Sequence, residues 1–173
     1  MLGSYEMKFI GASLLWAVSI MIGINKASRF NARVSLIEKT KLFIEGIKIE
    51  IEYTCSSLPL IIEKFSSQDN FDCLDFLKLC QKKLHEGVDF PCAWKNSVLQ
   101  SSSLYLKDEK DKLINLGQVL GTSDLNGQLS LLSMYSNYFD EFLTEAKKQK
   151  DKYSNMSVSL GVFVGLAVFV LVL

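Results

Sequence analysis

The residue types that most often carry out catalysis are few in this chain, and they are not grouped. The single histidine, His85, stands in Leu-His-Glu-Gly and lacks the second histidine of a His-Glu-x-x-His zinc motif. There is no Gly-x-x-x-x-Gly-Lys-Ser/Thr phosphate loop and no Gly-x-Ser-x-Gly nucleophile elbow. Glu50 and Glu52 are two residues apart, on different faces of a helix, where solvation is expected. We therefore expect a protein that is not an enzyme and that uses no cofactor or metal.

The strongest local pattern is a turn motif made of Leu120, Gly121, Ser123, Asp124 and Gln128. Gly121 is suited to the left-handed position that ends a helix. Ser123 or Asp124 is suited to cap the next helix, and the carboxylate is also favoured by the helix dipole. The motif therefore predicts a tight helical hairpin and requires no catalytic role.

The segment around this motif, residues 25–155, is predicted to be all-α. It contains only two prolines, Pro59 and Pro91, each placed where a helix can begin, and it shows no sustained period-two alternation. We expect six helices joined by short connections, which favours a bundle. Their expected ranges are up to about 54, 59–65, 71–86, 91–101, a helix ending at 120, and 123 to about 153.

Two helices carry apolar stripes that indicate a core. In the first, Ile37, Ile44 and Ile51 recur every seven residues, and Gly46 is the weak point of the pattern. The last helix has two stripes, which fit either a central helix packed on two sides or a face for self-association. In the first helix, the intervening positions of the same stripe are Thr40, Ile47 and Thr54. In the last helix, one stripe is Leu125, Leu129, Leu132, Phe139, Leu143 and Ala146, and the other is Leu131, Tyr135, Tyr138 and Phe142.

The four cysteines show no Cys-x-x-Cys spacing. Cys73 and Cys80 are seven residues apart, as core residues on one helical face would be. This favours buried free thiols in a reducing compartment.

The charge of the chain is balanced overall but uneven along the sequence. The formal net charge is zero, so nothing in the total favours nucleic acid. Basic residues gather in 25–41 and 145–155, whereas residues 42–144 hold 9 positive and 15 negative charges. The acidic middle could face a basic protein partner or could simply keep the domain soluble.

Both ends of the chain are apolar runs long enough to suggest transmembrane helices, at residues 7–24 and 156–173. The competing interpretations are a cleaved signal peptide for the first run and a buried core helix for the second. Met7-Lys8 would also be a plausible start of the chain. Lysine and arginine follow the first run and precede the second, which predicts a cytoplasmic middle domain with both termini outside.

The order of motifs resembles the stage III sporulation protein AB family. The residues that carry the resemblance are Lys8 before the first run, Ser57-Leu58-Pro59-Leu60, Phe90-Pro91-x-Ala93-Trp94, and Leu120-Gly121-x-Ser123-Asp124-x-x-x-Gln128 before a long helix into the C-terminal run. That family is similar to the cytoplasmic domain of type II secretion F proteins, a six-helix bundle. The resemblance implies a mother-cell membrane protein of the channel complex that joins mother cell and forespore, with a cytoplasmic sporulation ATPase as partner.

The chain departs from secretion F proteins in having one such domain and two spans, which makes a homo-oligomer more attractive. The acidic Gly-Glu-x-x-Gly turn of those proteins is here Gly121-Thr122-Ser123-Asp124, so a carboxylate role would fall on Asp124.

These observations together predict a non-enzymatic membrane platform that couples an ATPase to the channel. The alternatives are a small membrane-bound enzyme and a transmembrane signalling bundle. We expect the far ends of the first and last long helices to meet, so that Glu50, Glu52 and Asp124 offer carboxylates to a basic partner. Otherwise these residues only cap helices and solubilise the tip, or the interface lies on the stripe that contains Tyr135, Tyr138 and Phe142.

Overall fold

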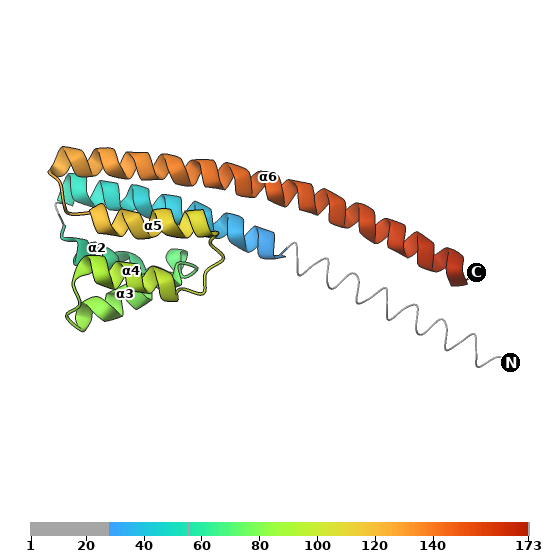
Figure 1. The fold of residues 1–173 in the computed structure, drawn as a ribbon, viewed down its shortest axis with the longest axis horizontal. Coiled ribbons are helices and arrows are strands. Elements are labelled where there is room, and N and C mark those ends of the chain that lie inside the picture. The colour runs from blue at the N-terminus through green and yellow to red at the C-terminus, as the bar shows by residue number, and fades with distance from the viewer. Residues whose placement is uncertain (1–27, 55, 173) are drawn as a thin grey trace. The chain divides into compact units, whose positions relative to one another are not determined.

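The fold of this chain is helical, as the sequence predicts. The computed structural model describes residues 28–54 and 56–172, with the side chains of 154–172 left out, and over this part it has six α-helices and no strand. The first helix covers residues 28–49 and runs on as the π-helix Glu50–Thr54 (Figure 1). It is followed by α2 (Leu58–Ser66), the 3-10 helix η2 (Asp69–Phe71), α3 (Asp75–His85), α4 (Phe90–Gln100), α5 (Lys107–Val119) and α6 (Leu125–Val172).

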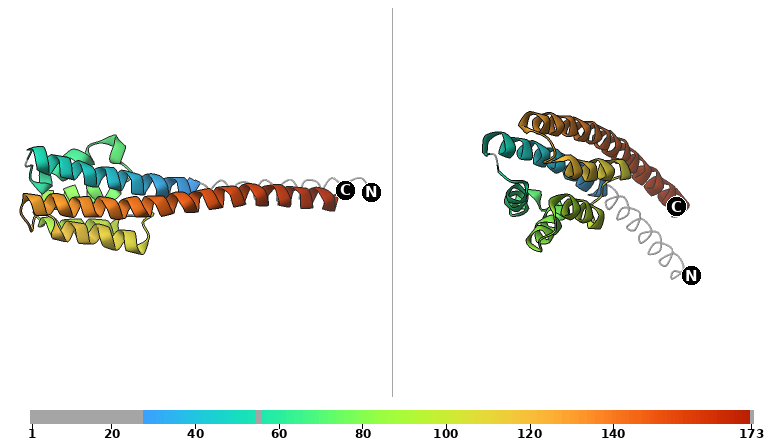
Figure 2. Two further views of the ribbon diagram at one scale, coloured as in Figure 1. Left: turned by 90° about the horizontal axis from the view of Figure 1, so that it is seen from above. Right: turned by 60° about the vertical axis from the view of Figure 1, so that its left-hand side comes forward.

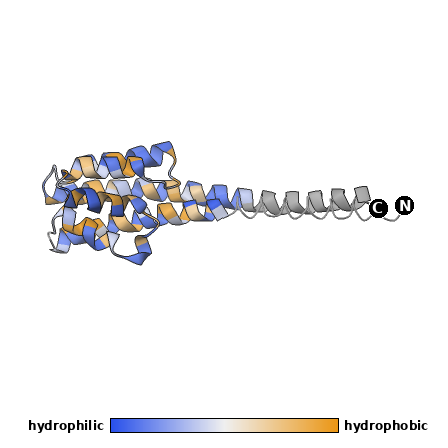
Figure 3. Ribbon diagram, turned by 90° about the horizontal axis from the view of Figure 1, so that it is seen from below, coloured by the Kyte–Doolittle hydropathy of each residue, from blue (hydrophilic) through white to orange (hydrophobic). Residues whose placement is uncertain are grey.

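The chain divides into two compact units, residues 33–145 and residues 1–32 with 146–173. Within residues 33–145, the first helix, α5 and α6 lie side by side in one layer, and α2, α3 and α4 form a second layer (Figures 1 and 2). Hydrophobic and hydrophilic residues are interspersed along these helices (Figure 3), as expected for helices that each bury one side.

Polar contacts fix the first helix antiparallel to α6. Lys41 Nζ lies 2.5 Å from Asp140 Oδ1, and Lys48 Nζ donates to Ser133 Oγ at 2.9 Å. As the residue number rises by seven on the first helix, it falls by seven on α6. The end of the first helix therefore lies beside the start of α6.

The core between the two layers is built around Phe43. Its ring contacts Phe65 of α2, Phe76 of α3 and Trp94 of α4, with centroids 5.2, 6.1 and 6.0 Å away. Trp94 satisfies its own N–H by donating to the carbonyl oxygen of Leu113 in α5 at 2.7 Å. The stripe predicted on the first helix is buried as expected except at its last position, since Ile37, Thr40, Ile44, Ile47 and Ile51 are buried whereas Thr54 is exposed.

Glycine is required where the first helix crosses α2. A Cβ at Gly46 would lie 2.4 Å from Cζ of Phe65. The absence of a side chain lets the Phe65 ring pack directly on the helix backbone. The weak point in the predicted stripe is therefore a close contact between two helices.

Two sequence predictions about the third helix and its cysteines are wrong in part. The helix begins at Asp75 and not at Phe71, because Phe71 belongs to the 3-10 turn η2, from which its ring packs against Phe65 (5.2 Å). Cys73 precedes the helix and is exposed, so its spacing to the buried Cys80 does not place both on one helical face. Cys92 is also exposed, and Cys55 lies outside the described residues. Burial raises the pKa of the Cys80 thiol to about 12.

The α6 helix is packed on two sides of its bundle part. Leu132, Phe139 and Leu143 of the first predicted stripe are buried, whereas Leu125 is 45% exposed. In the second stripe Tyr135 is buried, and the ring of Tyr138 lies 4.0 Å from Lys112 Nζ of α5. These contacts favour the interpretation of a central helix over that of a free association face.

The α6 helix continues without a break to Val172. In the unit that contains its C-terminal part, the rings of Phe30 and Tyr153 stack with centroids 4.6 Å apart. Among the residues described with side chains, no helix combines the length and apolarity needed to cross a bilayer. The predicted spans 7–24 and 156–173 lie outside the residues described with side chains, so they stay predictions.

Candidate functional site

The end of the first helix and the start of α6 meet at a shallow pocket. It has a volume of about 330 Å³, and its wall includes both Ile51 of the π-helix and Leu125 of α6. The full lining is Ile51, Ser56, Ser57, Leu58, Gly121, Leu125 and Gln128. We call this region, with the adjoining residues 50–54 and 120–124, the tip. The structure thus brings together the two segments that the sequence analysis expects to meet.

The turn motif forms one wall of the tip, and its residues serve the hairpin as expected. Gly121 has φ +81°, the left-handed conformation that ends α5. Asp124 Oδ1 accepts a hydrogen bond from the backbone N–H of Gly127 at 3.1 Å, so the aspartate caps α6. Gln128 Nε2 donates to the carbonyl oxygen of Ser123 at 3.0 Å, and Leu120 is buried. The hairpin therefore accounts for Leu120, Gly121, Asp124 and Gln128, and Ser123 contributes its backbone carbonyl.

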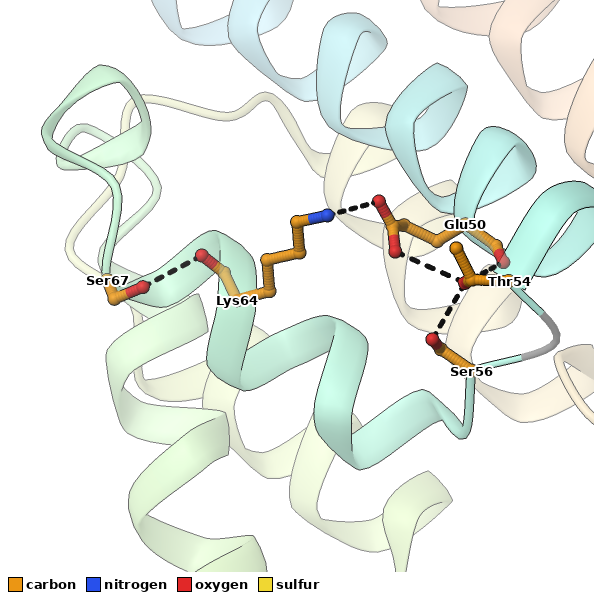
Figure 4. A network of polar contacts seen from close by, with 5 residues as sticks. All are labelled: Glu50, Thr54, Ser56, Lys64 and Ser67. Atoms are coloured by element: carbon orange, nitrogen blue, oxygen red, sulfur yellow. Dashed lines mark hydrogen bonds and ion pairs between the residues drawn. The ribbon is translucent and has the colours of Figure 1, made fainter.

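Glu50 is bonded within the chain. Its Oε1 lies 2.5 Å from Lys64 Nζ of α2, and its side chain is only 14% exposed. Thr54 donates to the Glu50 carbonyl oxygen at 2.5 Å and lies 2.7 Å from the Ser56 hydroxyl (Figure 4). The hydrogen bond from Lys64 lowers the pKa of Glu50. The Glu50 carboxylate is thus engaged in joining the first helix to α2 and is poorly placed for a partner.

Glu52 and Asp124 are the exposed carboxylates of the tip. Glu52 forms no ion pair with any residue in the described part of the chain. Asp124 uses one carboxylate oxygen in its cap and is exposed. Tyr53, next to Glu52, is 77% exposed. These groups belong to a π-helix and a helix N-terminus, and π-helices recur at functional sites.

Lys64 is a part of this region that was not predicted from the sequence. Lys64 is 14 residues from Glu50, on a different helix, and its hydrogen bond depends on how α2 packs on the first helix. No local spacing signals such a pair. Of the two serines that line the pocket, only Ser57 belongs to the Ser57-Leu58-Pro59-Leu60 motif noted in the sequence, and Ser56 was not singled out.

The chemistry available at the tip is that of recognition. The pocket presents apolar side chains from Ile51, Leu58 and Leu125 with hydroxyl and amide groups between them. Such a surface can receive an apolar side chain of a partner and donate hydrogen bonds around it. Among the residues with described side chains, no group of three or more His, Cys, Asp or Glu could hold a metal ion.

The family described as stage III sporulation protein AB matches residues 8–173. No curated protein and no solved structure matches this chain.

Proposed function

Since this chain belongs to the stage III sporulation protein AB family and is therefore a sporulation-associated protein, we propose that it is a non-enzymatic membrane platform. In this role it couples a cytoplasmic ATPase to the channel between mother cell and forespore. The observation that carries the proposal is the match over residues 8–173, which includes both apolar runs and the whole bundle. A likeness to the cytoplasmic domain of secretion F proteins is part of the proposal.

The membrane part of the proposal rests on the apolar runs 7–24 and 156–173. The α6 helix runs unbroken from Leu125 to Val172, so bundle and C-terminal run belong to one helix. The basic residues beside each run favour a cytoplasmic bundle. A reporter inserted within residues 101–104 should report the cytoplasm, and tags at both termini should report the outside. A reporter there that appears outside would overturn this topology and remove access to the ATPase.

The ATPase-binding part of the proposal places the partner at the tip. Glu52 and Asp124 offer exposed carboxylates beside an open apolar pocket, which suits a basic segment with an apolar side chain. Attraction of this kind speeds association and weakens with salt. We assign Glu50 to structure in this proposal, because its carboxylate is paired with Lys64 of α2.

The test measures binding of the sporulation ATPase to the full chain in nanodiscs at low and high salt. The variant Glu52→Lys/Asp124→Lys should weaken binding at low salt. The matched control, Glu141→Lys, reverses an exposed charge on α6 away from the tip and should bind like wild type. Equal binding by the folded double variant would place the interface elsewhere. No binding by wild type at low salt would contradict the coupling role itself.

A further inference from the structure

The solvent face of the first helix carries an apolar stripe with acidic neighbours. Leu42 and Ile49 are seven residues apart, hence on one face, and they are 44% and 55% exposed. Glu38 and Glu45 follow the same spacing beside them. Glu45 accepts a hydrogen bond from Ser136 at 3.1 Å and lies 4.0 Å from Lys41 Nζ, yet its side chain stays 44% exposed. Glu38 has no ion pair within the described part of the chain. We call Glu38, Leu42, Glu45 and Ile49 the acidic stripe.

A second exposed apolar surface, with the opposite charge, lies where α4 leads into α5. Leu99, Leu104 and Leu106 are exposed there. Lys95 stands one turn before Leu99 on α4, and Lys107 follows Leu106; both lysines are exposed. We call Lys95, Leu99, Leu104, Leu106 and Lys107 the basic patch.

The basic patch is continuous across the connection between the two helices. Lys110 Nζ of α5 donates to the carbonyl oxygen of Leu99 at the end of α4 (3.2 Å), which adds a third positive charge. The exposed carboxylate of Asp108 follows Lys107 but is turned by about 100° around the helix. Three lysines thus border the leucines, and the Asp75 carboxylate beside the same connection is taken up by hydrogen bonds from Ser101, Ser102 and Ser103.

The two surfaces face away from each other at a similar level of the bundle. Phe43, on the core side of the first helix, stacks on Trp94 of α4 at 6.0 Å, so the outer sides of these two helices point in opposite directions. Thr40 Oγ1 lies 2.5 Å from the hydroxyl of Tyr105 in the patch connection. These contacts place the basic patch and the acidic stripe at a similar height along the bundle, on opposite sides of it. Two copies in the same orientation can therefore pack side by side without a large shift along the bundle axis.

Half of the exposed large apolar residues lie on these two surfaces. They supply five of the ten found among the described residues. Exposed apolar groups that gather within a polar border mark interaction sites. We propose that the acidic stripe of one copy binds the basic patch of a second copy. Because the two surfaces differ, the contact is head-to-tail and generates a row or a closed ring of copies.

A charge-swap experiment on the full chain in detergent tests this contact. The stripe variant is Glu38→Lys/Glu45→Lys, and the patch variant is Lys95→Glu/Lys107→Glu. The matched controls, Glu141→Lys and Lys82→Glu, reverse exposed charges on α6 and α3, outside both surfaces. Molar mass is followed by light scattering over a range of protein concentrations at low and high salt, and circular dichroism checks the fold of each variant.

Wild type and controls should self-associate at low salt and dissociate as salt rises. Each swapped variant alone should associate more weakly by about tenfold or more, because like charges then face each other. An equimolar mixture of the two variants should recover association, since each positive surface meets a negative one. A monomeric wild type at low salt, unchanged association of a folded variant, or a mixture that does not recover would each overturn the proposal.

Discussion

Arg33 Nη2 lies 2.5 Å from Glu109 Oε1, in an ion pair whose side chains are 10% and 2% exposed. The pair joins the first helix to α5, two elements separated by most of the bundle sequence. The other carboxylate oxygen of Glu109 accepts a hydrogen bond from the backbone N–H of Leu106 at 2.7 Å and so caps α5. One buried carboxylate thus fixes both the packing and the start of a helix.

Removing the charge of Glu109 should destabilise the bundle strongly. Glu109→Gln keeps the side-chain size but removes the negative charge that pairs with the buried Arg33 guanidinium, which should cost about 3 kcal/mol of unfolding free energy. Arg33→Met/Glu109→Gln removes both charges and should be less destabilised than Glu109→Gln alone. Urea unfolding of the full chain in detergent measures both. If the double variant is less stable than Glu109→Gln, loss of the ion pair is not the main cause of the destabilisation.

Asp75 should make stability depend on pH in the acid range. Burial tends to raise the pKa of Asp75, but hydrogen bonds from Ser101, Ser103 and Ser102 outweigh it, and the pKa lies below the ordinary value of 3.8. A lowered folded-state pKa gives stability that is fully present above 3.8 and is lost as the pH falls below it. Asp75→Asn should therefore melt at a lower temperature than wild type at pH 7.

The difference in melting temperature should narrow below about pH 4, where the unfolded wild-type carboxyl takes up its proton. Asp111→Asn, an exposed change on α5, is the control and should leave melting nearly unchanged at both pH values. A difference in melting temperature between Asp75→Asn and wild type that stays constant from pH 7 to pH 3 would show that the charge of Asp75 does not contribute to stability.

The buried stripes should not tolerate a carboxylate. Ile47 is 1% exposed and Leu132 is fully buried, so Ile47→Asp and Leu132→Asp each place an unpaired charge in the core and should prevent stable folding. Ile49→Asp is a close control, because Ile49 is two residues from Ile47 on the solvent face and should melt within a few degrees of wild type. Thermal melts followed by circular dichroism compare the three. Equal melting of Ile47→Asp and Ile49→Asp would contradict the described core.

How far the sequence could predict this fold depends on the range of the interactions. Local signals worked: Pro91 stands in the first turn of α4, and Gly121 has the positive φ that the turn motif requires. Periodicity likewise identified the buried face of the first helix. These features are set by residues within about one or two helical turns.

Features set by tertiary packing could not be predicted. Gly117 appears in the sequence as an ordinary helical glycine, yet a Cβ there would lie 2.1 Å from Cδ1 of Trp94. The Arg33–Glu109 pair spans 76 residues and the Glu50–Lys64 pair spans 14, so neither has a local spacing. At the tip, the sequence could place acidic residues together but could not tell a carboxylate bonded within the chain from an exposed one.

The last prediction separates structure from recognition at the tip. Glu50→Lys sets two ammonium groups against each other and should lower the melting temperature, and Lys64→Glu should do the same with two carboxylates. The exchange Glu50→Lys/Lys64→Glu restores opposite charges and should recover most of the loss. Glu52→Lys changes an exposed residue and should leave the melting temperature unchanged while weakening ATPase binding at low salt.

Melting temperature and ATPase binding should therefore change independently of each other in these variants. The charge exchange at Glu50 and Lys64 keeps the net charge of the tip, so ATPase binding should stay close to that of wild type once the fold is restored. Loss of ATPase binding by the stable exchange variant would show that the partner contacts the Glu50 carboxylate in spite of its bond to Lys64. In that case the assignment of Glu50 to structure and of Glu52 to recognition is wrong, and the partner competes with Lys64 for the partly exposed Glu50 carboxylate.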